Sequence, residues 1–69
     1  MRFNIYGRYQ LEVVRQDNAW IVYRTGDGKR RREMGLVIPS SVMAADVPMY
    51  LDDLLHELAS PGATIRRLD

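Results

Sequence analysis

The chain has 69 residues, 46% of them hydrophobic and 28% charged, and its formal net charge is +1 at pH 7. This composition excludes a disordered chain, and no apolar run approaches the ~20 residues that span a bilayer, so we expect one soluble, cytoplasmic domain over residues 1–69. Cysteine is absent, which excludes a disulfide framework and a cysteine-based zinc site.

Residues 2–15 carry apolar side chains at most odd positions and polar ones at most even positions, which predicts a β-strand with one buried face. The stretch is more than twice the usual strand length, and Gly7 interrupts its apolar side. Because the alternation keeps its parity across Gly7, we expect a bend there, at which the strand changes its pairing partner, and not a bulge.

Residues 16–18 form the next turn. In a three-residue loop the last residue adopts the left-handed conformation, which asparagine tolerates, so we expect Asn18 at that position. The resulting register pairs Leu11 with Tyr23, whereas a two-residue turn would place Arg24 opposite Leu11 and interrupt the apolar face. We therefore expect the longer loop, which puts three apolar side chains on the other face of the sheet: Val14, Trp20 and Val22.

A second strand is predicted over residues 19–25, and the glycines of Gly26, Asp27 and Gly28 supply a tight reversal after it. From Arg32 the apolar side chains fall on alternate positions again, which predicts a third strand that ends at Pro39. These three strands make an antiparallel meander.

One amphipathic helix is predicted over residues 47–59, with Asp46 as N-cap and Pro48 in its first turn. Residues 40–45 lead to it as a crossing segment. After the helix, residues 63–68 form either a short fourth strand beside residues 3–6 or a frayed tail.

These elements define an α+β fold with the helix packed on one face of the sheet. The predicted core consists of the inward positions of strands and helix: Phe3, Ile5, Tyr9, Leu11, Val13, Ile21, Tyr23, Met34, Leu36, Ile38, Tyr50, Leu51, Leu54 and Leu58.

Three segments of the chain carry a resemblance: Phe-Asn-Ile-Tyr-Gly-Arg at residues 3–8, Gly-Asp-Gly-Lys-Arg at 26–30, and the stretch from Tyr50 to Gly62. In these segments the chain resembles a family of small uncharacterised bacterial proteins of about this length. The resemblance implies a single domain of the bacterial cytoplasm. It implies no activity, ligand or site residue.

Asp52, Asp53 and His56 bring two carboxylates and the only histidine to neighbouring helix positions. One imidazole with carboxylates is an incomplete set for a tetrahedral metal site, and a solvated acidic helix face is the simpler interpretation. With no cysteine nucleophile and no spacing motif linking a serine to His56, we expect no metal, no cofactor and no enzymatic activity.

The leading functional hypothesis is a small interaction module that binds a protein partner or a second copy of itself. One helix covers only one face of a sheet, so apolar side chains on the other face form a contact surface unless the crossing segment or the tail covers them. The predicted surface comprises Val14, Trp20, Val22 and Tyr6.

The alternative hypothesis is nucleic-acid binding through a basic hairpin tip. Residues 1–33 carry eight basic and four acidic side chains, whereas residues 34–65 carry four acidic and no basic ones. The tip residues are Lys29, Arg30, Arg31 and Arg32, and we expect Arg24, Arg8 and Trp20 on the outward sheet face to extend the basic surface. Two features argue against this hypothesis: the net charge of the whole chain is close to zero, and the helix is acidic. Charged side chains at a hairpin tip are also commonly only solvated.

Overall fold

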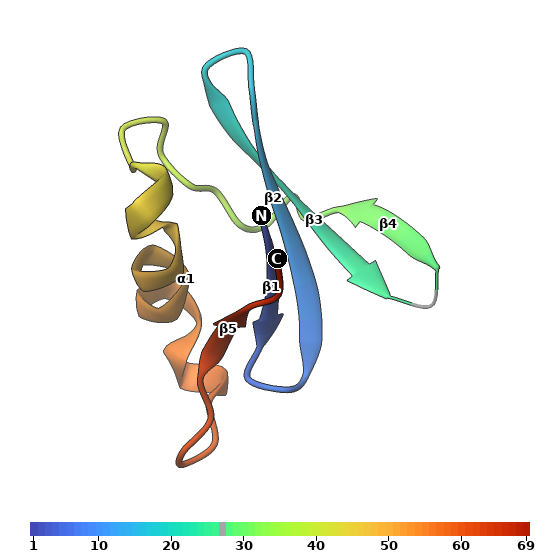
Figure 1. The fold of residues 1–69 in the computed structure, drawn as a ribbon, viewed down its shortest axis with the longest axis vertical. Coiled ribbons are helices and arrows are strands. Elements are labelled where there is room, and N and C mark those ends of the chain that lie inside the picture. The colour runs from blue at the N-terminus through green and yellow to red at the C-terminus, as the bar shows by residue number, and fades with distance from the viewer. Residues whose placement is uncertain (27) are drawn as a thin grey trace.

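A computed structural model of the protein describes residues 1–26 and 28–69. The described residues form an antiparallel sheet of five strands and one helical segment, so the predicted α+β class is confirmed and the expected three or four strands were too few (Figure 1). The strands lie in the order β4-β3-β2-β1-β5. Their bounds are β1 Arg2–Ile5, β2 Tyr9–Gln16, β3 Ala19–Gly26, β4 Lys29–Arg32 and β5 Ile65–Arg67.

The predicted long first strand is wrong, because Gly7 lies in a hairpin turn and not at a bend. Tyr6 and Gly7 have φ angles of 55° and 73°, and the Arg8 amide donates a hydrogen bond to the Ile5 carbonyl at 2.9 Å. The chain therefore folds back, and β1 pairs with β2, Ile5 opposite Tyr9. In this register odd-numbered residues face odd-numbered ones, so the alternation keeps its parity through the turn.

The predicted register of the second hairpin is also wrong. Asp17 and Asn18, with φ angles of 49° and 66°, form a two-residue turn, whose backbone twist matches that of the flanking strands. Asn18 is left-handed as expected, but so is Asp17. Leu11 consequently lies opposite Arg24, and the one-residue shift exchanges the two faces of β3.

The third strand begins earlier than predicted. β4 is Lys29–Arg32, and the Glu33 amide, which donates to the Val22 carbonyl at 2.9 Å, marks the point where pairing ends. Residues 33–43 then cross the sheet without strand pairing, which contradicts the strand predicted from Arg32 to Pro39. Of the predicted glycine turn, Gly28 has a φ angle of 72°, and residue 27 lies outside the described residues.

The helical segment consists of a 3₁₀ turn at Ala44–Asp46, α1 at Val47–Leu55 and a second 3₁₀ turn at His56–Leu58. Asp46 precedes α1 but makes no side-chain cap hydrogen bond. The helix lies on one side of the sheet, against β1, β2 and β5 (Figure 1).

The core lies between α1 and the sheet face that carries the odd-numbered residues of β1 and β2. Its buried side chains are Phe3, Ile5, Tyr6, Leu11, Val13, Val22, Ile38, Val47 and Leu51. Met34, Leu54 and Leu58 were predicted as core but are 74%, 48% and 42% exposed. Ile21 and Tyr23 are half-buried on the opposite face, because of the shifted register of β3.

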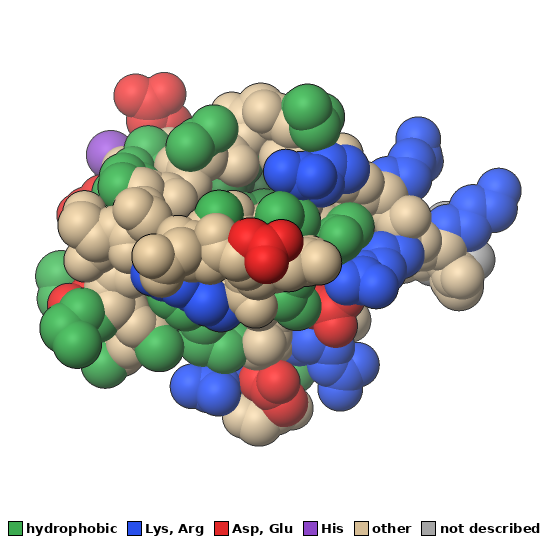
Figure 2. Space-filling model, turned by 90° about the horizontal axis from the view of Figure 1, so that it is seen from above, with side chains coloured by type: hydrophobic (Ala, Val, Ile, Leu, Met, Phe, Trp, Pro, Cys, Tyr) green, Lys and Arg blue, Asp and Glu red, His purple; other side chains and the backbone are tan. Residues whose placement is uncertain are grey.

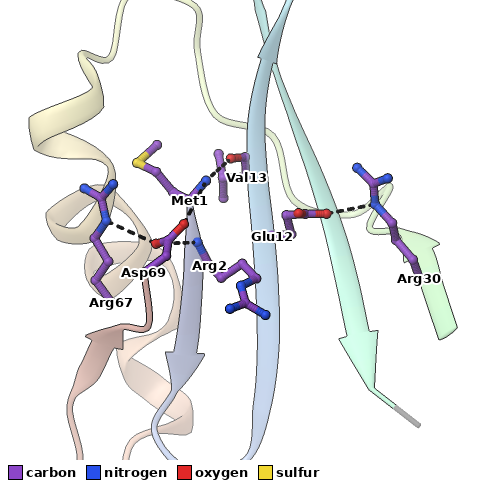
Figure 3. Close-up of polar contacts among 7 residues, drawn as sticks. All are labelled: Met1, Arg2, Glu12, Val13, Arg30, Arg67 and Asp69. Atoms are coloured by element: carbon purple, nitrogen blue, oxygen red, sulfur yellow. Dashed lines mark hydrogen bonds and ion pairs between the residues drawn. The ribbon is translucent and has the colours of Figure 1, made fainter. Parts of the chain in front are cut away.

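The C-terminal residues form β5 beside β1, which decides between the two predicted alternatives in favour of a strand. The chain ends meet there (Figure 3). The Met1 ammonium donates to the Val13 carbonyl at 2.9 Å and lies 3.8 Å from the Asp69 carboxylate, which also accepts a hydrogen bond from the Arg2 amide at 3.1 Å. That hydrogen bond is the main reason why the pKa of Asp69 lies below its ordinary value of 3.8.

Candidate functional site

A groove of about 710 Å³ with a basic lining lies on the β3–β4 hairpin. We call it the basic groove. It is lined by Arg8, Tyr9, Arg24, Thr25, Gly26, Lys29, Arg31, Arg32 and Glu33. Five cationic side chains therefore face the groove with one carboxylate, although the whole chain is close to neutral.

Strand pairing explains why distant residues meet in this groove. Arg24 lies opposite Arg31, and Gly26 lies opposite Lys29, so Arg24, Lys29 and Arg31 point to the same face of the hairpin. Arg8 comes from the β1–β2 turn, next to the start of β2. Like charges on directly opposed strand residues are unfavourable in the absence of an anion, so the pair of Arg24 and Arg31 favours a negatively charged ligand.

Tyr9 supports the basic groove from the sheet. The Arg24 guanidinium lies over its ring, 4.1 Å from the ring centroid. Burial raises the pKa of Tyr9, and the Glu33 carboxylate raises it further, while Arg24 opposes them. The hydroxyl therefore stays protonated near neutral pH and is able to donate a hydrogen bond to an anion.

The cations of the groove are largely uncompensated within the described residues. Of the β4 side chains, Arg30 has an ion-pair partner in that part of the chain, the Glu12 carboxylate at 2.9 Å (Figure 3). Arg30 also lies over the Tyr23 ring, 3.7 Å from its centroid, on the sheet face opposite Arg24. The residues of the nucleic-acid hypothesis thus divide. Arg30 and Trp20 do not line the groove, whereas the others do: Arg8, Arg24, Lys29, Arg31 and Arg32.

Charge is separated along the molecule. In Figure 2 several Lys and Arg side chains stand at the end of the molecule that holds the β3–β4 hairpin, others lie toward its lower edge, and the histidine lies with acidic side chains at the opposite end, over the helix. An anion that approaches the hairpin therefore meets the basic end before the acidic one.

The residues predicted to bind a protein partner do not share one surface. Val22 and Tyr6 are buried, 2% and 8% exposed, and the Tyr6 hydroxyl donates to the Asp52 carboxylate. The Trp20 indole is half-buried on the covered face, where its Nε1 donates to the Val42 carbonyl at 2.8 Å. Val14 alone lies on the opposite face, because the two-residue turn moved Trp20 and Val22 to the helix side.

The acidic helix positions do not assemble a metal site. The Asp52 carboxylate accepts a hydrogen bond from the Tyr6 hydroxyl, and the His56 Nδ1 lies 3.1 Å from the Asp53 carbonyl oxygen. Over residues 1–26 and 28–69, no group of three His, Asp or Glu side chains is placed to hold a metal ion. In the same residues no helix is long and apolar enough to cross a membrane.

Sequence reasoning missed the part that Tyr9 plays in the groove. It assigned Tyr9 to the core from the alternation of residues 2–15, and the ring does pack against the core. The cross-strand neighbours that place Arg24 over Tyr9 depend on the hairpin register, which is set by the backbone of a two-residue turn.

Fold and groove together define a small α+β domain with a basic groove on a β-hairpin. No curated protein and no solved structure matches the chain. The chain belongs to the family described as "Domain of unknown function (DUF7661)", which it matches over residues 1–69. The expected membership of a family of unknown function is thereby confirmed.

Proposed function

We propose that this protein is a non-catalytic module that binds nucleic acid, with the phosphates of the ligand held in the basic groove. The observation that carries the proposal is the convergence of five Arg and Lys side chains, from three separate segments, on one groove with a single carboxylate. A bacterial, cytoplasmic setting belongs to the same proposal.

The chemistry of the lining supports phosphate as the ligand group. Arginine forms paired hydrogen bonds to phosphate oxygens, and four of the five cations are arginines. These five side chains occupy exposed strand and turn positions. In the free protein they are therefore solvated, and no unpaired charge is buried before the ligand binds. The groove is too polar and open to select a small apolar ligand.

The test is fluorescence anisotropy with labelled DNA and RNA oligonucleotides of mixed sequence, titrated at a series of salt concentrations. We expect binding that weakens steeply with salt, because each neutralised phosphate adds about 0.7 to 0.9 to the slope of log K against log salt. Arg31→Ser should weaken binding and lower the magnitude of that slope by about 0.7 to 0.9, the contribution of one phosphate contact.

Arg66→Ser is the matched control. Arg66 is also an exposed arginine on an edge strand, β5, but it lines neither the basic groove nor its surroundings, so its loss changes net charge equally and should leave binding nearly unchanged. Absence of binding at low salt, or equal loss of affinity in both variants, would contradict the proposal.

Binding of a protein partner or of a second copy is the second candidate. It is supported by the face opposite the helix, where Val14 and Ile21 lie directly opposite each other and remain half-buried. Sedimentation of wild type and Val14→Ser tests self-association through this face. A monomer at all concentrations, or an oligomer unaffected by Val14→Ser, would exclude self-association through this face.

A further inference from the structure

A second hollow adjoins the basic groove. Its volume is about 530 Å³, and we call it the edge hollow. It is lined by Arg2, Tyr9, Gln10, Thr25, Gly26, Gly28, Lys29 and Arg30. Four residues line both hollows, namely Tyr9, Thr25, Gly26 and Lys29, so the two form one continuous surface.

Most of the cations that line only one of the two hollows lie on different faces of the sheet. Arg32 is the exception, because it lines the basic groove but lies opposite Tyr23 and therefore on the same face as Arg30. Arg24 and Arg31 are directly opposed and belong to the helix-side face. Thr25 and Arg30 are opposed one position further along, so they belong to the other face, as do Arg2 and Gln10.

The shared residues mark the place where the basic surface passes from one face to the other. They stand at the start of β2, the end of β3 and the start of β4, which is one end of the sheet. The cations of both hollows therefore follow a path that turns around the strand ends.

Resting on the proposed function, we infer that the ligand is a single-stranded nucleic acid whose backbone runs through the basic groove, around the strand ends at Tyr9, and into the edge hollow. A duplex is too stiff to follow this path, since its persistence length is about 150 base pairs, and it reaches the cations of only one face at a time. A single strand bends between successive nucleotides and reaches both.

The pair of Arg24 and Tyr9 supplies the surface on which a base stacks. The Arg24 guanidinium lies 4.1 Å from the Tyr9 ring centroid, and Arg24 itself is exposed, so solvent and ligands can reach this side chain. Stacking on aromatic rings and arginine planes is a common mode of single-strand binding and tolerates any base.

The first experiment compares a labelled single strand with its matched duplex at the same salt concentration. The single strand should bind at least about tenfold more tightly, which corresponds to contacts on two faces instead of one. Arg2→Ser, which changes the edge hollow alone, should lower the salt slope of the single strand by about 0.7 and leave duplex binding unchanged.

Arg24→Lys separates stacking from charge. Lysine keeps the positive charge but lacks the planar guanidinium, so single-strand affinity should fall by about fivefold or more while the salt slope stays constant. Arg24 is exposed, and the variant should melt like wild type.

The outcomes distinguish the inference from the function on which it rests. If neither single strand nor duplex binds at low salt, the proposed function fails. If duplex binds as tightly as single strand, or if Arg2→Ser leaves the single-strand slope unchanged, nucleic-acid binding stands and the path around the strand ends is refuted. An Arg24→Lys variant with wild-type single-strand affinity refutes the stacking surface.

Discussion

Substituting Tyr6 by phenylalanine tests how the first hairpin is attached to the helix. Tyr6 lies in the β1–β2 turn with a φ angle of 55°, a conformation that is uncommon for a residue other than glycine or asparagine. Its ring is buried, and its hydroxyl donates to the carboxylate of Asp52 on α1. Tyr6→Phe keeps the ring and removes this hydrogen bond.

The expected loss of stability follows from the environment of the two partners. A hydrogen bond to a charged group contributes roughly 1.5 to 3 kcal/mol, but water replaces the lost donor at the exposed Asp52 carboxylate, so we expect about 1 to 2 kcal/mol. The whole domain should have a free energy of unfolding of only about 3 to 10 kcal/mol. The melting temperature should therefore fall by about 5 to 15 °C.

Tyr50→Phe provides the control. The Tyr50 hydroxyl lies 3.5 Å from the Val37 carbonyl, at the limit of a hydrogen bond, so the same substitution should cost less than about 0.5 kcal/mol. Urea and thermal unfolding followed by circular dichroism measure both variants. If Tyr6→Phe unfolds at the same midpoint as Tyr50→Phe, the attachment through Asp52 contributes nothing and the reasoning is wrong.

The pH dependence of stability provides a second test of the hydrogen bond between Tyr6 and Asp52. Burial, followed by the hydrogen bond to Asp52, raises the pKa of Tyr6 to about 12 from its ordinary 10.0. The unfolded state therefore loses the proton first, and the contribution of Tyr6, complete below pH 10, disappears as the pH rises toward 12. The difference between wild type and Tyr6→Phe should shrink over that range, and a constant difference would contradict the assignment.

Three further predictions concern other contacts. Asn18→Gly should be neutral or mildly stabilising, whereas Asn18→Val should cost about 1 kcal/mol or more because Asn18 has a φ angle of 66°; equal urea midpoints would mean that the turn is built differently. Trp20→Ser should cost about 2 to 3 kcal/mol through lost packing and the lost bond to the Val42 carbonyl, and a variant that melts like wild type would place Trp20 outside the core. Asp69→Asn should lose less stability than wild type on acidification below pH 3.8, because the lowered pKa of Asp69 contributes stability that is present above its ordinary value and lost as the pH falls; parallel melting curves of the two proteins in acid would refute this.

The alternation of side chains was sufficient to predict strands, one helix and most of the buried positions. It could not predict the β1–β2 hairpin, because odd residues face odd residues across that turn and the pattern is the same for a straight strand and for a hairpin. What marks the turn is a left-handed Tyr6, and tyrosine gives no sequence signal for that conformation.

The candidate surfaces were predicted with unequal success for a related reason. The basic tip could be predicted from composition alone, and Lys29, Arg31 and Arg32 are exposed although the predicted register was wrong. Membership of the apolar surface depended on the side to which β3 turns its side chains. The observed turn is one residue shorter than the predicted loop, which exchanges the two faces of β3. Trp20 and Val22 therefore lie on the helix-covered face.

The two outer strands of the sheet share one property, which bears on how the protein behaves at high concentration. β4 is Lys-Arg-Arg-Arg and β5 is Ile-Arg-Arg, so each open edge of the sheet presents a row of positive charges. An unpaired strand edge is a template on which a second molecule adds a strand, and repeated addition leads to fibrils. Like charges on the two edges oppose an edge-to-edge approach of two molecules. Arg31 and Arg32, which we assign to ligand binding, and the arginines of β5 therefore oppose polymerisation of the free protein.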